Sequence, residues 1–111
     1  MAATIPGSYR DALAAYAGRL RLRFSGRVRF VRLFGSWARG TAGPDSDVDV
    51  AVVIEGLTPT EWAVAVGLAA ESEIAGGEPL SPFVVSGARF DELLLRERRL
   101  ASDVVAQGVD L

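Results

Sequence analysis

Two apolar runs rich in β-branched residues most constrain how this chain can fold. Val28–Phe34 (VRFVRLF) and Val48–Ile54 (VDVAVVI) are each predicted to be a strand. The second run is apolar on both faces beyond Val50, so we expect it in the middle of a sheet, where both faces are covered. Two aspartates, Asp47 and Asp49, stand at its beginning. Carboxylates at the entrance to a buried strand cost free energy unless something compensates them.

Helical periodicity separates the predicted strands. Apolar residues recur at intervals of three and four, which is the spacing of one helix face. The predicted helices cover residues 8–23, Glu61–Ile74 and Arg89–Gln107. A third strand is predicted at Leu80–Val85, where Pro82 favours an edge position or a bulge. This order predicts an α/β fold, with one compact domain over residues 1–111 and a small mixed β-sheet flanked by helices.

The start of the second helix carries the clearest local signal. Thr58 is a typical cap, and Pro59 follows it at the first helical position. Glu61 stands three residues after the threonine, which completes a capping box. The Gly76-Gly77 pair is expected to end this helix.

Composition removes several kinds of chemistry. The chain has no cysteine, which excludes disulfides and thiolate sites, and no histidine, the commonest general base and metal ligand. Chemistry must therefore rest on carboxylates, hydroxyls, backbone amides and arginine. No signal-peptide pattern is evident and no apolar stretch is long enough to span a membrane, so we expect a cytoplasmic protein without membrane contact.

Charge is unevenly distributed along the chain. All 12 basic residues are arginines, eight of them between Arg10 and Arg39, whereas ten of the acids lie between Asp45 and Glu92. This asymmetry is equally compatible with steering of an anionic ligand and with ordinary solvated faces. Aromatic residues are sparse in the basic segment 19–32, which disfavours a nucleic-acid-binding surface there.

The acid pair suggests a metal site. Alternate residues of a strand point to the same side, so Asp47 and Asp49 would face one way while Val48 and Val50 enter the core. Convergent carboxylates without a nearby cation suit a divalent metal, and all-oxygen ligation favours Mg²⁺ or Mn²⁺. Taken alone, an Asp-x-Asp at a strand end is more often solvated or part of a turn.

The end of the first strand suggests a phosphate site. Gly35 would let a phosphate approach the backbone closely. If a helical turn begins at Ser36, its first amides and the serine hydroxyl present donors to an anion. Arg39, one turn later, could reach the same anion through its fork of donors. Trp37, between them, could stack on a nucleobase, but we expect it to pack against the protein.

At these residues the sequence resembles a known family. GSWARGTAGPDSDVDVAVV is similar to the Gly-Ser and Asp-x-Asp signature of the DNA polymerase beta-like nucleotidyltransferases, and most closely to the small minimal nucleotidyltransferases. The resemblance implies that Ser36 binds the triphosphate and that Asp47 and Asp49 hold two divalent ions and are catalytic. It also implies a third carboxylate on the strand at Leu80–Val85.

That third acid is the main departure from the family pattern. The apparent match is Ser81, and a serine hydroxyl is a poor metal ligand and a poor base at neutral pH. Glu78 lies three residues earlier and could substitute, whereas Glu55 lies at the far end of the preceding strand and is not expected to reach a metal.

Two functional hypotheses follow from the resemblance. The first is metal-dependent transfer of a nucleoside monophosphate, AMP above all, from a nucleoside triphosphate to an acceptor hydroxyl. Minimal nucleotidyltransferases are often paired with a small helical HEPN-type protein as toxin and antitoxin, and the acceptor could lie on such a partner. The alternative is a catalytically weak or inactive antitoxin or binding module that neutralises its HEPN-type partner by contact.

Overall fold

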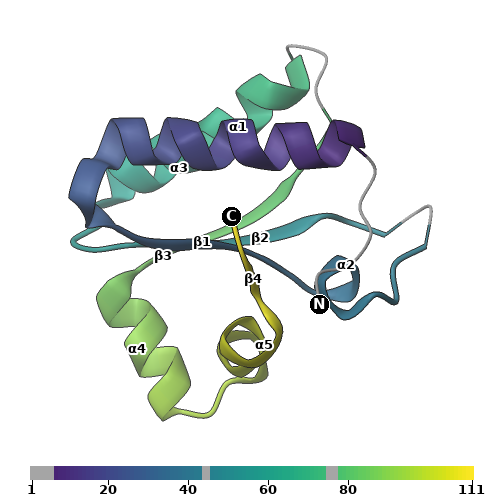
Figure 1. Ribbon diagram of the computed structural model, residues 1–111. Helices are drawn as coiled ribbons and strands as arrows, with labels where there is room; N and C mark the ends of the chain where they lie inside the picture. Colours follow the sequence, from purple (N-terminus) through teal and green to yellow (C-terminus); the bar gives the residue numbers. More distant parts are fainter. Residues whose placement is uncertain (1–6, 44–45, 75–77) are drawn as a thin grey trace.

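The computed structural model describes residues 7–43, 46–74 and 78–111 of the chain (Figure 1). The helices are α1 (Gly7–Phe24), α2 (Ser36–Arg39), α3 (Pro59–Ile74), α4 (Gly87–Leu95) and α5 (Arg99–Gln107), with a 3₁₀ turn η1 (Ser25–Arg27) after α1. The strands are β1 (Val28–Phe34), β2 (Asp49–Ile54), β3 (Ser81–Ser86) and β4 (Val109–Asp110). The predicted α/β class and mixed sheet are confirmed.

The four strands form one sheet in the order β3-β2-β1-β4. Strand β2 runs parallel to β3 and antiparallel to β1, and β4 pairs antiparallel with the outer side of β1. Val50–Ile54 is fully buried, which confirms the central position that its continuous apolar run predicts. Pro82 lies on the edge strand β3, as its missing amide hydrogen favours.

Helices cover both faces of the sheet. Helices α1 and α3 lie on one face, and α4 and α5 on the other (Figure 1). Leu13, Tyr16 and Leu20 of α1 pack on one face of the sheet, where the Tyr16 hydroxyl donates a 2.8 Å hydrogen bond to the Ala65 carbonyl of α3. On the opposite face, Phe90 of α4 meets the ring of Phe30 edge-on at 5.3 Å.

One prediction about the C-terminal third was wrong. The single helix expected over Arg89–Gln107 is two helices, because the chain turns between α4 and α5. At the turn Glu97 takes a positive φ of 54°, and the amide of Arg98 donates to the Leu93 carbonyl. The change of direction lets both helices lie on the sheet, where they bury Phe90, Ala101 and Val104. The short strand β4 was not predicted at all.

The capping box of α3 has the predicted geometry and gains an ion pair. The Thr58 hydroxyl accepts a hydrogen bond from the Glu61 amide at 3.2 Å, and the Thr58 amide donates to the Glu61 carboxylate at 3.1 Å. Both carboxylate oxygens of Glu61 also accept hydrogen bonds from the Arg27 guanidinium, each at 2.7 Å. These contacts join the start of α3 to the turn that precedes β1.

Protonation of Glu61 is expected to destabilise the fold in acid. The hydrogen bonds from Arg27, and next those from Thr58, lower the pKa of Glu61 from 4.5 to about 2. Because the folded state holds this proton less tightly than the unfolded chain, the stabilisation is complete above pH 4.5 and is lost as pH falls toward 2. Urea unfolding between pH 2 and 6 should therefore show a steeper acid decline for the wild type than for Glu61→Gln. Equal slopes would contradict this role of Glu61.

The arginines of the basic segment face acids from the middle and the end of the chain. Arg29 of β1 binds Glu55 at 2.7 Å and Asp91 at 2.6 Å, and Arg32 binds Asp110 at 2.6 Å. These pairs favour the solvated-face interpretation of the charge asymmetry for the arginines of β1. Among the described residues, none of the helices has both the length and the apolar character needed to cross a bilayer.

Candidate active site

The two predicted motifs meet at one end of the sheet. Gly35 follows the last residue of β1, and Phe34 pairs with Asp49, the first residue of β2. The neighbouring strands that the motif hypothesis required are therefore present. The turn that leaves β1 and the acids that open β2 lie next to each other.

Gly35 makes this junction possible. Its backbone has φ 74° and ψ −154°, a conformation that is essentially restricted to glycine. A Cβ atom built on this residue would lie 2.5 Å from Oδ2 of Asp49. The absence of a side chain thus lets the Asp49 carboxylate pack directly against the backbone of the turn.

A short helix begins directly after this glycine. Helix α2 spans Ser36–Arg39, as expected, and Gly40 ends it in the left-handed conformation. The Arg39 amide donates to the Gly35 carbonyl at 3.1 Å, whereas the first amides of a helix have no partner within it. Ser36 is half-buried and Arg39 is exposed, so the serine lies in the turn and the guanidinium is accessible to a ligand.

The acid pair has the alternation predicted for it. Val48 and Val50 are 2% and 0% exposed, so the two intervening positions do enter the core. Asp47 precedes β2 and is exposed, while Asp49 is half-buried. Burial, and then the negative charge of Asp47, raise the pKa of Asp49, and Arg39 opposes them. The carboxylates therefore repel one another in a way that a bound cation would relieve.

Ser81 occupies the position opposite Asp49 on the neighbouring strand. The two residues are partners in the β2–β3 register, and the Ser81 amide donates to the Val48 carbonyl at 2.9 Å. Glu78 precedes β3 and is half-buried, and Glu55 pairs with Arg29. Within the described part of the chain, no three acidic side chains gather around a common point that could hold a metal.

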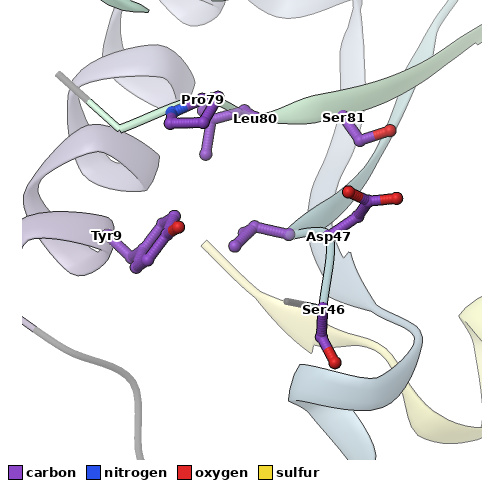
Figure 2. A pocket seen from close by; sticks show the side chains of 7 residues that line it. Tyr9, Ser46, Asp47, Pro79, Leu80 and Ser81 are labelled. Atoms are coloured by element: carbon purple, nitrogen blue, oxygen red, sulfur yellow. The ribbon is translucent and has the colours of Figure 1, made fainter. Parts of the chain in front are cut away.

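A cleft of about 380 Å³ opens beside the acid pair. Figure 2 shows Tyr9 of α1 on one side of it and the Asp47 carboxylate and Ser81 hydroxyl on the other. Its lining residues are Tyr9, Ser46, Asp47, Val48, Pro79, Leu80 and Ser81. Tyr9 was not foreseen as a site residue, because a tyrosine in the first turn of an amphipathic helix gives no functional signal in sequence.

Trp37 packs as expected. Its indole nitrogen donates to the Ser46 carbonyl at 3.3 Å, and its ring lies 6.0 Å from that of Tyr9. The tryptophan therefore packs beside Tyr9 and joins α2 to Ser46, the residue before Asp47.

A second cleft of about 750 Å³ opens against α2 and shares no lining residue with the first. It lies between α2 with the residues just after it and the junction of α5 with β4. Its lining residues are Ala38, Arg39, Thr41, Ala106, Gln107, Gly108 and Val109. We refer to it below as the α2–α5 cleft.

Comparisons with known proteins agree with this arrangement. The model of the nucleotidyltransferase domain family matches residues 16–104. A solved structure assigned as a minimal nucleotidyltransferase is 29% identical, with a TM-score of 0.60 over 95% of this chain and 94% of that one. No curated protein matches the chain.

Two toxin–antitoxin structures are also similar to this chain. One, solved with AMP-PNP, is 25% identical, with a TM-score of 0.51 over 86% of this chain and 68% of that one. A variant of the MntA-HpeT complex is 23% identical, with a TM-score of 0.50 over 97% and 72%, and supports the fold alone. The family match over most of the chain, together with the first structural match, shows that the chain belongs to the nucleotidyltransferase domain family and, within it, to the minimal nucleotidyltransferases.

Proposed function

We propose that this protein transfers a nucleoside monophosphate, AMP by preference, from a nucleoside triphosphate to an acceptor hydroxyl, in a reaction that requires Mg²⁺ or Mn²⁺. The observation that carries the proposal is the packing of the Asp49 carboxylate against Gly35, with no room for a Cβ atom between them. Either motif alone is common. Their contact supports a phosphate-binding role for the turn and a metal-binding role for the acid pair, because one phosphate and one cation would then meet.

Each side chain has a distinct part in this proposal. Gly35 and the first amides of α2 donate hydrogen bonds to the phosphates, with the Ser36 hydroxyl as a further donor. Arg39, exposed at the end of α2, neutralises phosphate charge. Asp47 and Asp49 hold the divalent ion.

The donor set fits such an ion. Asp47 and Asp49 offer an all-oxygen, anionic pair in which the charge of Asp47 disfavours ionisation of Asp49, and Mg²⁺ is commonly bound by one or two carboxylates together with substrate phosphates. When bound, the ion neutralises charge on the phosphate oxygens during displacement at phosphorus. Ser81 stands opposite Asp49, where the family resemblance implies a third carboxylate, and it offers only a weak oxygen donor. The ion would therefore have one protein carboxylate fewer than the family pattern.

The residues of the chain position the reactants for an in-line displacement. The acceptor oxygen forms a bond to the α-phosphorus while the bond from that phosphorus to the bridging oxygen of pyrophosphate breaks. Pyrophosphate leaves while held by the α2 amides and Arg39, and the hydroxyl proton passes to water in the open cleft. Most of the rate enhancement in this kind of reaction comes from positioning and charge stabilisation.

A partner protein is the proposed source of the acceptor. The similar toxin–antitoxin structure solved with AMP-PNP supports an adenine nucleotide as the donor and a second protein as the source of the acceptor. The cleft beside Asp47 is open and only about 380 Å³, which suits a side-chain hydroxyl presented by another chain. A HEPN-type protein is the partner that we propose.

Ser81 supports a second candidate function. With a serine opposite Asp49, that position of the described sheet offers no obvious group to activate an acceptor hydroxyl. A module that binds the nucleotide weakly and neutralises a HEPN-type partner by contact would need no such group. Partner inhibition that persists without nucleotide, and without release of pyrophosphate, would favour this candidate over transfer.

Removal of metal provides the direct test of the proposed function. Calorimetric titration with ATP should show binding in the presence of Mg²⁺ and none after chelation with EDTA, because Asp47 and Asp49 repel a triphosphate that lacks a bridging cation. Titration with GTP, CTP and UTP under the same conditions measures the base preference. Binding that is indifferent to EDTA, or no binding of any triphosphate, would overturn the proposal.

A further inference from the structure

We propose that the nucleoside half of the donor nucleotide binds in the α2–α5 cleft. This inference rests on the proposed function, because it takes the turn at Gly35 as the place of the phosphates. It adds a site separate from the cleft beside Asp47, built largely by the C-terminal segment of the chain, and assigns to it the sugar and the base.

The size and lining of the cleft suit such a ligand. Its volume of about 750 Å³ falls within the range of roughly 300–1,000 Å³ that is usual for small-molecule and cofactor sites. Ala38 on one wall and Ala106 on the other are small, so the space between α2 and α5 is not filled by side chains. The cleft is therefore wide enough for a flat ring system.

The cleft continues directly from the phosphate-binding turn. Helix α2 has only four residues and rises about 6 Å, with Gly35 before its first residue and Arg39 as its last. Gly35 contacts Asp49, and Arg39 lines the cleft. A nucleotide whose phosphates follow α2 thus reaches the cleft without crossing any other element.

Charge distinguishes this cleft from the one beside Asp47. Among the described residues, the lining of the α2–α5 cleft contains the cation Arg39 and no carboxylate, whereas the other cleft contains Asp47 and no cation. The nucleoside is uncharged, but Arg39 attracts the phosphates attached to it toward the first cleft, whereas Asp47 repels them from the second unless a metal intervenes. The cleft that carries Asp47 and Ser81 then remains for the acceptor.

Two polar side chains in the cleft can recognise a nucleoside. The exposed amide of Gln107 offers a donor and an acceptor together, which match the edge of a nucleobase. Thr41 lies on the opposite wall, where its hydroxyl donates a long 3.5 Å hydrogen bond to the Ser36 carbonyl and can accept one from a ribose hydroxyl. Replacement of Gln107 should therefore alter the preference among bases.

Filling the cleft provides the test. Ala106→Trp places a large ring at an exposed position of its wall, and Thr41→Trp does so from the other side. We expect each variant to bind Mg·ATP at least about tenfold more weakly, while Mg·tripolyphosphate, which has no nucleoside, binds within twofold of the wild type. Val105→Trp, exposed on the same helix but outside the lining, is the matched control and should bind both ligands normally.

Each result of this experiment has a definite meaning. If folded Ala106→Trp and Thr41→Trp bind Mg·ATP with wild-type affinity, the nucleoside does not bind in the α2–α5 cleft. The proposed function would then remain intact. Equal loss of tripolyphosphate binding would also overturn the assignment of the nucleoside to this cleft, because the tryptophan would then act on the phosphate site. If the wild type binds neither ligand, the proposed function itself has failed.

Discussion

Asp49→Asn is expected to remove Mg²⁺-dependent nucleotide binding and transfer. Loss of a residue that only supports a metal ligand typically costs 10–100-fold in metal affinity, so loss of the ligand itself should cost at least about 100-fold, or about 2.8 kcal/mol. Calorimetry with Mg·ATP measures the first effect. Release of pyrophosphate in the presence of a HEPN-type partner measures the second.

The same substitution should leave the fold at least as stable as the wild type. Burial and the charge of Asp47 raise the pKa of Asp49, so its ionised form is less favourable in the folded protein than in the unfolded chain. The resulting penalty is absent below the unfolded pKa, grows as pH rises toward the folded pKa, and is complete above it. Asparagine is neutral and removes the penalty, which urea unfolding at neutral pH would show as an unchanged or higher midpoint.

Asp91→Asn is the matched control for this experiment. Asp91 accepts hydrogen bonds from Arg29, which lower its pKa, so its ionised form stabilises the fold. Its neutral variant should be slightly less stable and should bind nucleotide normally. If Asp49→Asn lost stability but still bound nucleotide, Asp49 would stabilise the fold as Asp91 does. That result would contradict the proposed metal site.

Gly35→Ala is expected to destabilise the protein by about 3 kcal/mol or more, because a side chain is strained at φ 74° and ψ −154°. The added methyl group would also meet Oδ2 of Asp49 at 2.5 Å, so the carboxylate or the turn must move. Nucleotide binding should fall with it, since both proposed sites depend on this contact. Urea unfolding and calorimetry on the same preparation measure the two effects.

Gly40 allows the effect of backbone strain to be separated from that of the contact. It also has a positive φ, 77°, but a Cβ atom there would have no atom within 4 Å. Gly40→Ala should therefore cost only about 1–2 kcal/mol and leave nucleotide affinity near that of the wild type. Equal losses of stability and affinity in the two variants would mean that the contact between Gly35 and Asp49 has no special importance.

Much of the fold is predictable because local signals agree with the tertiary structure. Strand β1 begins and ends at the predicted residues, and β2 begins one residue later than predicted. The capping box at Thr58 has both predicted hydrogen bonds, because it depends only on residues three apart. Continuous burial of β2 follows from a run that is apolar on both faces.

The rest depends on contacts between distant residues. The break between α4 and α5 is invisible in sequence, since Glu97 is an ordinary helix-forming residue that adopts a positive φ to end one helix before the next begins. Strand β4 has two residues and exists only because β1 provides an edge. At the site, the motifs identify Gly35 and Asp49, but the participation of Tyr9 in one cleft and Gln107 in another requires the folded chain.

Strand β4 has a consequence for local unfolding. It holds the outer edge of the sheet through a two-residue pairing, although Arg32 and its partner Asp110 are 78 positions apart in the sequence. This short pairing, one exposed ion pair and the partly buried Val109 and Leu111 hold the segment, so few contacts resist its local opening. Native-state hydrogen exchange should therefore find the amides of β4 among the first to lose protection. The amides of the buried central strand β2 should exchange much more slowly. A ligand lodged against this segment would slow that exchange, so nucleotide affinity and the local stability of the C-terminal edge are thermodynamically coupled.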